Sequence, residues 1–96
     1  MYLLVTYDMN TTTKAGEKRL RKIAKLCKAY GQRVQKSVFE CNVSKINYEK
    51  FRHSLLELID EEKDGLRIYH LHGDPKDFVE EHGKGRSIDY EKPLVL

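Results

Sequence analysis

The chain has 96 residues, of which 40% are hydrophobic and 34% are charged, a size that supports one domain with a modest core and favours dimerisation to bury more. No apolar run is long enough to cross a bilayer, and the two cysteines form neither a disulfide framework nor a metal-binding spacing, so a membrane protein is excluded and a cytoplasmic location is expected. The net charge of +3 is unevenly divided: residues 1–43 carry nine Lys and Arg against three acids (+6), and residues 44–96 carry nine against twelve (−3), which predicts a basic face that meets nucleic acid.

A strand is predicted over residues 2–7, "YLLVTY", because nearly every residue there is apolar or favours β structure. The strand leads to Asp8, and the polar run "DMNTTT" is typical of a connection to a helix. Two interpretations of Asp8 stay open. Its carboxylate either accepts backbone hydrogen bonds in a turn or binds a metal ion, for which a second copy of Asp8 across a two-fold axis would supply the missing ligand.

An amphipathic helix is predicted over residues 14–30, with Thr13 as its N-cap and Gly31 ending it at the C′ position. Apolar residues at helical spacing predict a buried stripe of Leu20, Ile23, Ala24 and Cys27. The same helix carries seven positive charges, which are Lys14, Lys18, Arg19, Arg21, Lys22, Lys25 and Lys28.

Only one acid, Glu17, accompanies these seven charges. Like charges at i, i+4 destabilise a helix by about 0.2–0.5 kcal/mol per pair, and a merely solvated face would usually intersperse Glu. We therefore expect the face opposite the stripe to bind a phosphate backbone without sequence specificity. That face holds Lys18, Arg21, Lys22, Lys25 and Lys28, and Arg33 and Lys36 extend it. The alternative, a solvated face without a partner, stays open.

Residues 32–43 favour β structure, but their alternation slips at Lys36–Ser37, which predicts either a bulge or two short strands joined by a kink. Phe39 is interpreted as a core residue, with a contact at a DNA or dimer surface as the alternative. Ser37 is a poor nucleophile candidate because no His–acid pair stands near it in the sequence. Its hydroxyl is expected to contact phosphate or backbone.

A second helix is predicted to begin after Ser44, its N-cap, and to end at Asp64–Gly65. Val43 and Tyr48 stand at the positions of a hydrophobic staple. The expected buried stripe comprises Tyr48, Phe51, Leu55, Leu58 and Ile59. A strand follows over residues 66–72, where His70 and His72 share a face and are expected to be core or edge residues rather than metal ligands.

This order of elements predicts an α+β fold, a ferredoxin-like βαββαβ sandwich with both helices on one face of an antiparallel sheet. We expect a single domain over residues 1–96, with its core in 1–73 and a tail in 74–96. The tail ends in the apolar run "PLVL", which would be explained by a C-terminal strand that pairs with a partner protomer in a symmetric homodimer.

Three segments together resemble the CRISPR-associated Cas-two family, the small protein that accompanies the Cas-one integrase. They are "YLLVTYDM", "GEKRLRKIAKLCKAYGQRVQKSVFEC" and "GLRIYHLHGD", and the resemblance extends to about Asp74. The tail "GKGRSIDYEKPLVL" is similar to that of the type I-C branch.

The resemblance implies that Asp8 from each protomer of a dimer converges on a divalent ion, Mg²⁺ or Mn²⁺. By motif position it also implies roles in activity or substrate contact for Tyr7, Arg19, Arg33, Ser37 and Phe39. Tyr7 is otherwise interpreted as a core or interface residue.

These observations favour a metal-dependent endonuclease of the CRISPR adaptation system that acts on double-stranded DNA. In this hypothesis Asp8 is the catalytic metal ligand. The predicted nucleic-acid contacts are Lys18, Arg19, Arg21, Lys22, Lys25, Arg33 and Ser37. Two alternatives remain: a non-catalytic DNA-binding scaffold whose acidic half docks a Cas-one-type integrase, and a ribonuclease that acts on single-stranded RNA.

Overall fold

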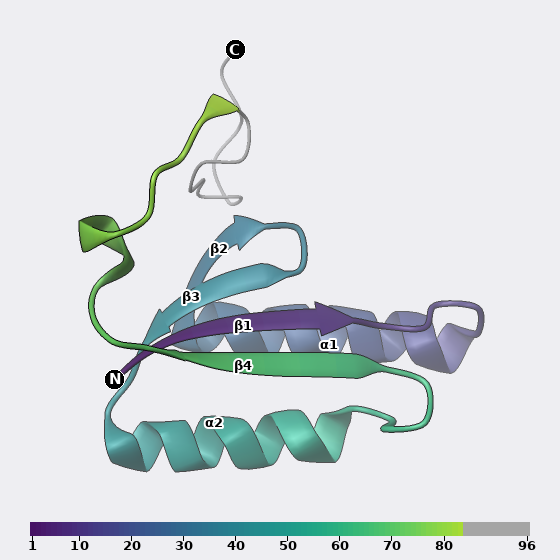
Figure 1. Cartoon of the computed structure of the whole chain (residues 1–96). Helices are drawn as coiled ribbons and strands as arrows, with labels where there is room; N and C mark the ends of the chain where they lie inside the picture. The colour runs from purple at the N-terminus through teal and green to yellow at the C-terminus, as the bar shows by residue number, and fades with distance from the viewer. Residues whose placement is uncertain (84–96) are drawn as a thin grey trace.

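The computed structural model describes residues 1–83 as one antiparallel sheet with both helices on the same face (Figure 1). The strands are β1 (Tyr2–Asp8), β2 (Gly31–Gln35), β3 (Val38–Asn42) and β4 (Gly65–Leu71), and the helices are α1 (Lys14–Tyr30) and α2 (Lys45–Leu58). The strand order is β2-β3-β1-β4. This order and the βαββαβ sequence of elements confirm the predicted α+β, ferredoxin-like fold. The predicted "PLVL" strand lies outside the described residues.

Alternation along β1 decides which side chains face the helices. Leu3, Val5 and Tyr7 are buried and belong to one core cluster, which also includes Ile23 and Cys27 of α1 and Phe51 and Leu55 of α2. Because successive side chains of a strand point to opposite faces, Leu4, Thr6 and Asp8 lie on the face that the helices do not cover.

Local sequence signals at the helix starts are confirmed. Thr13 caps α1 by accepting a hydrogen bond from the Gly16 N–H at 3.0 Å, and Ser44 caps α2 by accepting one from the Asn47 N–H at 3.1 Å. Val43 is buried and Tyr48 packs against the core, as a hydrophobic staple requires.

The segment with the slipped alternation contains both predicted features. β2 and β3 form a hairpin around Lys36–Ser37, and the register shifts between Arg33 and Gln35. Neither Gly nor Pro is needed, because none of residues 1–83 other than glycine adopts a positive φ. The hairpin tip is tied to the central strand by the Tyr7 N–H, which donates to the Ser37 carbonyl at 3.2 Å.

Gly31 corrects one prediction. It follows α1 with φ −161° and ψ −164°, an extended conformation that any residue can adopt, rather than the left-handed C′ conformation. Glycine is needed there because a Cβ atom would collide with the Cys41 Sγ and the Glu40 carbonyl oxygen. Glycine is therefore required by the close approach of neighbouring strands, which cannot be recognised from the sequence around Gly31.

The end of α2 also differs from its prediction. The helix stops at Leu58, with Ile59 as its C-cap, and does not continue to Asp64–Gly65. Residues 60–64 form a turn that is held by the Asp64 carboxylate, which accepts a hydrogen bond from the Asp60 N–H at 2.9 Å. Gly65 is then the first residue of β4, so this strand, which was predicted over residues 66–72, begins one residue earlier than expected.

Candidate active site and nucleic-acid interface

Asp8 is the last residue of β1, and it is exposed on the face of the sheet opposite the helices. Its partner across the sheet is Gly65 of β4, which has no side chain to cover the carboxylate. The two residues border a depression of about 250 Å³. The other residues that line this depression are Thr6, Tyr7, Leu66 and Arg67. A solvent-accessible carboxylate therefore stands at an open end of the sheet.

Within residues 1–83 the Asp8 carboxylate takes part in no hydrogen bond or ion pair. The role in the turn that one interpretation assigned to Asp8 is instead played by Asn10. Its Oδ1 accepts hydrogen bonds from the Thr12 N–H at 3.0 Å and the Thr12 hydroxyl at 2.7 Å. The geometry therefore supports the interpretation in which the Asp8 oxygens are available to a ligand.

A divalent ion fits Asp8 only as part of a larger ligand set. No group of three His, Cys, Asp or Glu in the described part of the chain is placed to hold a metal ion. Mg²⁺ is commonly held by one or two carboxylates together with water and substrate phosphate, and Mn²⁺ accepts the same oxygen ligands. Asp8 has the right donor atoms and the open surroundings, and the remaining ligands would come from a second protomer or from the substrate.

Four of the residues singled out by motif position come together beside this strand end, on the face that the helices cover. Phe39 is fully buried, which confirms it as a core residue, and its ring lies 6.2 Å from that of Tyr7. The Arg33 guanidinium carbon stands 5.0 Å from the centre of the Phe39 ring. Burial raises the pKa of the Tyr7 hydroxyl, whereas the neighbouring Arg33 and Ser37 act in the opposite direction. Tyr7 is therefore held as a neutral core residue directly before Asp8.

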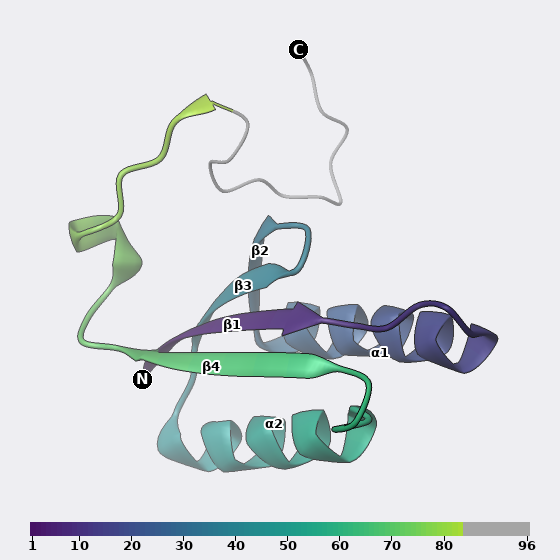
Figure 2. The same ribbon diagram turned by 45° about the vertical axis from the view of Figure 1, so that its right-hand side comes forward.

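The basic side of α1 faces away from the sheet. Its exposed residues are Lys14, Lys18, Arg21, Lys22, Lys25 and Lys28. On the opposite side of the helix, Ile23 and Cys27 are buried and Leu20 and Ala24 are half-buried, as predicted. Figure 2 shows α1 along one face of the sheet. Because Asp8 points to the other face, the sheet separates the basic surface from the carboxylate, and the two meet only around the end where β1 leads into α1.

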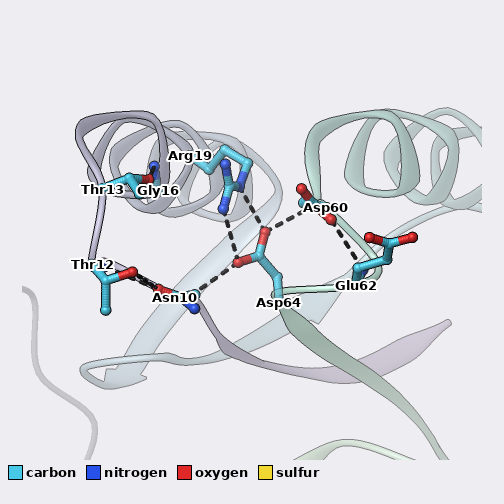
Figure 3. A network of polar contacts seen from close by, with 8 residues as sticks. All are labelled: Asn10, Thr12, Thr13, Gly16, Arg19, Asp60, Glu62 and Asp64. Atoms are coloured by element: carbon cyan, nitrogen blue, oxygen red, sulfur yellow. Dashed lines mark hydrogen bonds and ion pairs between the residues drawn. The ribbon is translucent and has the colours of Figure 1, made fainter.

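Arg19 is placed differently from the other charges of α1. Its Nε donates to the Asp64 Oδ2 at 2.8 Å and its Nη2 donates to the Asp64 Oδ1 at 3.3 Å (Figure 3). The Asp64 side chain is fully buried, and Arg19 is 17% exposed. The hydrogen bonds from Arg19, reinforced by those from the Asp60 and Asn10 N–H groups, lower the pKa of Asp64 to about 2 despite its burial.

Asp64 is the residue that the sequence analysis missed. The sequence predicts it as the end of α2, and nothing in its local sequence distinguishes it from the neighbouring acids Asp60, Glu61 and Glu62. Its importance arises from contacts with Arg19 and Asn10, which are 45 and 54 residues away in the chain.

The low pKa of Asp64 predicts a loss of stability in acid. Because the pKa is lower in the folded protein than the ordinary 3.8, the ionised carboxylate stabilises the fold above about pH 4, and this contribution is lost as the pH falls towards 2. We expect Asp64→Asn to lower Tm by about 5–10 °C at pH 7. The difference in Tm between this variant and wild type should become smaller as the pH falls from 4 to 2. Thermal unfolding from pH 2 to 7 measures this, with exposed Glu61→Gln as the control. A difference in Tm that stays constant over this pH range would contradict the low pKa of Asp64.

His70 lies on β4, an outer strand of the sheet, and its ring contacts Tyr48. The Tyr48 hydroxyl and the His70 Nε2 are 3.3 Å apart, so this histidine helps α2 pack on the edge of the sheet. Neither helix described between residues 1 and 83 is long and apolar enough to cross a membrane.

Comparison with known proteins gives consistent results. The model of the family described as CRISPR associated protein Cas2 matches residues 1–77. A Moorella thermoacetica protein named "CRISPR-associated endoribonuclease Cas2 1" is 54% identical over 96 residues, which is 100% of both chains. A Halalkalibacterium halodurans protein named "CRISPR-associated endonuclease Cas2" is 53% identical over the same full lengths. The crystal structure of Streptococcus pyogenes Cas2 at pH 6.5 superimposes with a TM-score of 0.78 at 52% identity, covering 86% of this chain and 100% of that one.

Proposed function

Because the chain belongs to the Cas2 family, the Cas-two family that its sequence resembles, we propose that it is an endonuclease of the CRISPR adaptation system that cleaves double-stranded DNA with Mg²⁺ or Mn²⁺ held at Asp8. The observation that carries the proposal is the exposed Asp8 carboxylate, which no residue of the described chain engages. Such a carboxylate at an open strand end is suited to hold a metal ion against a phosphate.

A homodimer is part of the proposal because, within residues 1–83 of one protomer, Asp8 is the one carboxylate that lines this depression. The helices leave the sheet face that carries Asp8 uncovered, and part of it is apolar, with Tyr69 43% exposed and Phe78 57% exposed beside Leu4 and Leu71. Pairing of this face with a second copy would bury apolar surface and bring two Asp8 side chains towards each other. We extend the proposal to one domain over residues 1–96, with the tail in 74–96 pairing with the partner.

Each functional residue has a separate task in this scheme. Asp8 would hold a divalent ion, which when bound would offset negative charge on the scissile phosphate and lower the pKa of a water. The cations of α1 hold the phosphate backbone by charge, with Arg33 and Ser37 near the hairpin tip as further contacts. Those cations are Lys18, Arg21, Lys22 and Lys25. Apart from Asp8, no group that could act as a general base at neutral pH lines the described depression, so turnover is expected to be slow.

A second candidate is cleavage of single-stranded RNA, which is favoured by the word "endoribonuclease" in the name of the Moorella thermoacetica relative. The separation of the basic surface from Asp8 favours a third, a scaffold that binds DNA without cutting it. In that case the acidic half and the tail of the chain would dock a Cas-one-type integrase. Glu40, Asp74 and Glu81 line a common pocket of about 640 Å³ that suits such a partner.

We also propose that the chain belongs to the type I-C-like branch, on the basis of its tail "GKGRSIDYEKPLVL", and that it acts in the cytoplasm. The preference for duplex DNA rests on the basic side of α1, whose exposed cations are spread along a helix of 17 residues. A helix of that length spans about 25 Å, enough to follow several phosphates of a duplex.

The test compares three substrates, linear duplex DNA, single-stranded RNA and single-stranded DNA, each with Mg²⁺, with Mn²⁺ and with EDTA. We expect cleavage of duplex DNA that requires metal, and binding by gel shift that does not. Cleavage of RNA alone would establish the second candidate. Metal-independent binding of duplex DNA without cleavage of any substrate would establish the scaffold.

A further inference from the structure

The turn before β4 and the loop after β1 are joined at one buried carboxylate. Asp64 accepts two hydrogen bonds from Arg19 of α1, one from the Asp60 N–H at 2.9 Å and one from the Asn10 N–H at 3.0 Å (Figure 3). The carboxylate is fully buried, and its donors come from three segments: α1, the loop after β1, and the turn that contains Asp64 itself. A buried charge with this many donors fixes its neighbours, because losing any donor would leave it poorly solvated.

Two neighbours of Asp8, one along the chain and one across the sheet, are connected to the Asp64 carboxylate. In the loop after β1, Asn10 is two residues beyond Asp8 and its N–H donates to Asp64. Across the sheet, Asp8 pairs with Gly65, which directly follows Asp64 in the chain. The connecting loop is also enclosed on its other side, because the Asn10 carbonyl packs so closely on Gly16 that a Cβ atom there would collide with it.

We propose that the Arg19–Asp64 pair fixes the position of Asp8, and that Arg19 is a positioning residue rather than a phosphate contact. Arg19 differs from the other cations of α1 in this respect. Lys18 and Arg21 are exposed on its two sides, whereas Arg19 directs two of its nitrogens at one carboxylate and is only 17% exposed. Turning Arg19 outward to a phosphate would remove the counter-charge from a buried Asp64.

The consequence for catalysis rests on the proposed function. A metal ligand must be held to within about 0.5 Å of its productive place, and the residues that hold it need not touch the substrate. Weakening the Arg19–Asp64 pair should therefore lower kcat with little change in KM. A lost phosphate contact would instead weaken binding and reduce its dependence on salt.

The experiment uses the full chain with Asp64→Asn, Arg19→Ala and Arg19→Lys. The matched controls are Glu61→Gln and Arg52→Ala, which remove the same charges from exposed positions outside the network. Three quantities are measured: amide hydrogen exchange at Asn10 relative to Val5 in the core, the salt dependence of duplex binding, and kcat and KM for cleavage. The Val5 amide reports global unfolding, so the ratio remains informative for a variant that is less stable.

We expect Asp64→Asn and Arg19→Ala to speed Asn10 exchange relative to Val5 by about tenfold or more, to lower kcat by a similar factor and to leave the salt dependence unchanged. The two substitutions combined should be no worse than either alone, because they remove one interaction. Arg19→Lys should restore part of the protection. An Arg19→Ala variant that reduces the slope of log K against log salt by about 0.9, while Asp64→Asn does not, would overturn the proposal in favour of a phosphate contact.

Unchanged Asn10 exchange in Asp64→Asn would also overturn it. A wild-type protein that cleaves nothing would contradict the proposed function alone, because the exchange ratio and the salt slope still decide whether the pair holds the Asp8 end of the sheet.

Discussion

Replacement of Asp8 by alanine is expected to reduce cleavage of duplex DNA by about 100-fold or more while changing duplex affinity by less than about twofold. The carboxylate is the proposed metal ligand, so its loss removes the ion from the scissile phosphate. The fold should be unaffected, because Asp8 is exposed and its carboxylate engages no other residue in the described chain. Cleavage and gel shift measured in the same samples, with Mg²⁺ and with EDTA, give both quantities.

Asp8→Asn separates charge from shape in the same experiment, since it keeps the size of the side chain and removes the negative charge. Glu49→Ala is the matched control, an exposed acid on α2 away from the strand end. Equal cleavage by wild type and both Asp8 variants would show that Asp8 is not a metal ligand. Duplex binding without any cleavage would then point to a scaffold.

Removal of the basic side of α1 should have the second large effect, and on binding rather than on chemistry. Replacing Lys18, Arg21, Lys22 and Lys25 together with alanine is expected to weaken duplex binding by about 10²–10³-fold at physiological salt, because each lost phosphate contact lowers the salt slope by about 0.9. The same substitution should raise Tm, since it removes repulsion between like charges and introduces the best helix former. Salt titrations of binding and a thermal melt measure the two effects.

The opposite signs of these effects make the prediction specific. A general loss of structure would lower both affinity and Tm. As the control, Lys45, Lys50, Arg52 and Lys63 carry the same total charge at exposed positions in or beside α2. If their replacement with alanine weakened binding to the same extent, affinity would depend on net charge alone and the α1 surface would not be the interface.

Local signals in the sequence were sufficient for most of the fold. The bounds of α1 follow from a capping threonine and an apolar stripe, and both lie within the helix or next to it. Ser44 was likewise recognisable as the cap of α2. The end of α2 was predicted wrongly because Asp64 was judged by its neighbours in sequence. Its partners Arg19 and Asn10 are brought to it only by the packing of the sheet and helices.

The same reasoning explains what could be predicted about the site. Asp8 and the cations of α1 could be identified from residue type and spacing. Their relative placement could not, because it depends on which face of β1 the helices cover. Tyr7 and Asp8 are adjacent in sequence, yet one is buried against the helices and the other is exposed. The prediction that the helix holds a polyanion close to Asp8 therefore needs a substrate that reaches around the end of the sheet, or a second protomer.

The placement of Asp8 and the lysines on opposite faces also bears on how such a protein can evolve. Substitution of the exposed carboxylate is expected to disturb neither the core nor the basic surface, so under the proposed function a descendant could lose cleavage and still bind a duplex. Loss of the lysines, in turn, leaves the strand end intact. Selection could thus act on cleavage and on nucleic-acid binding separately. A lineage could keep the binding surface for assembly with other proteins after nuclease activity is lost.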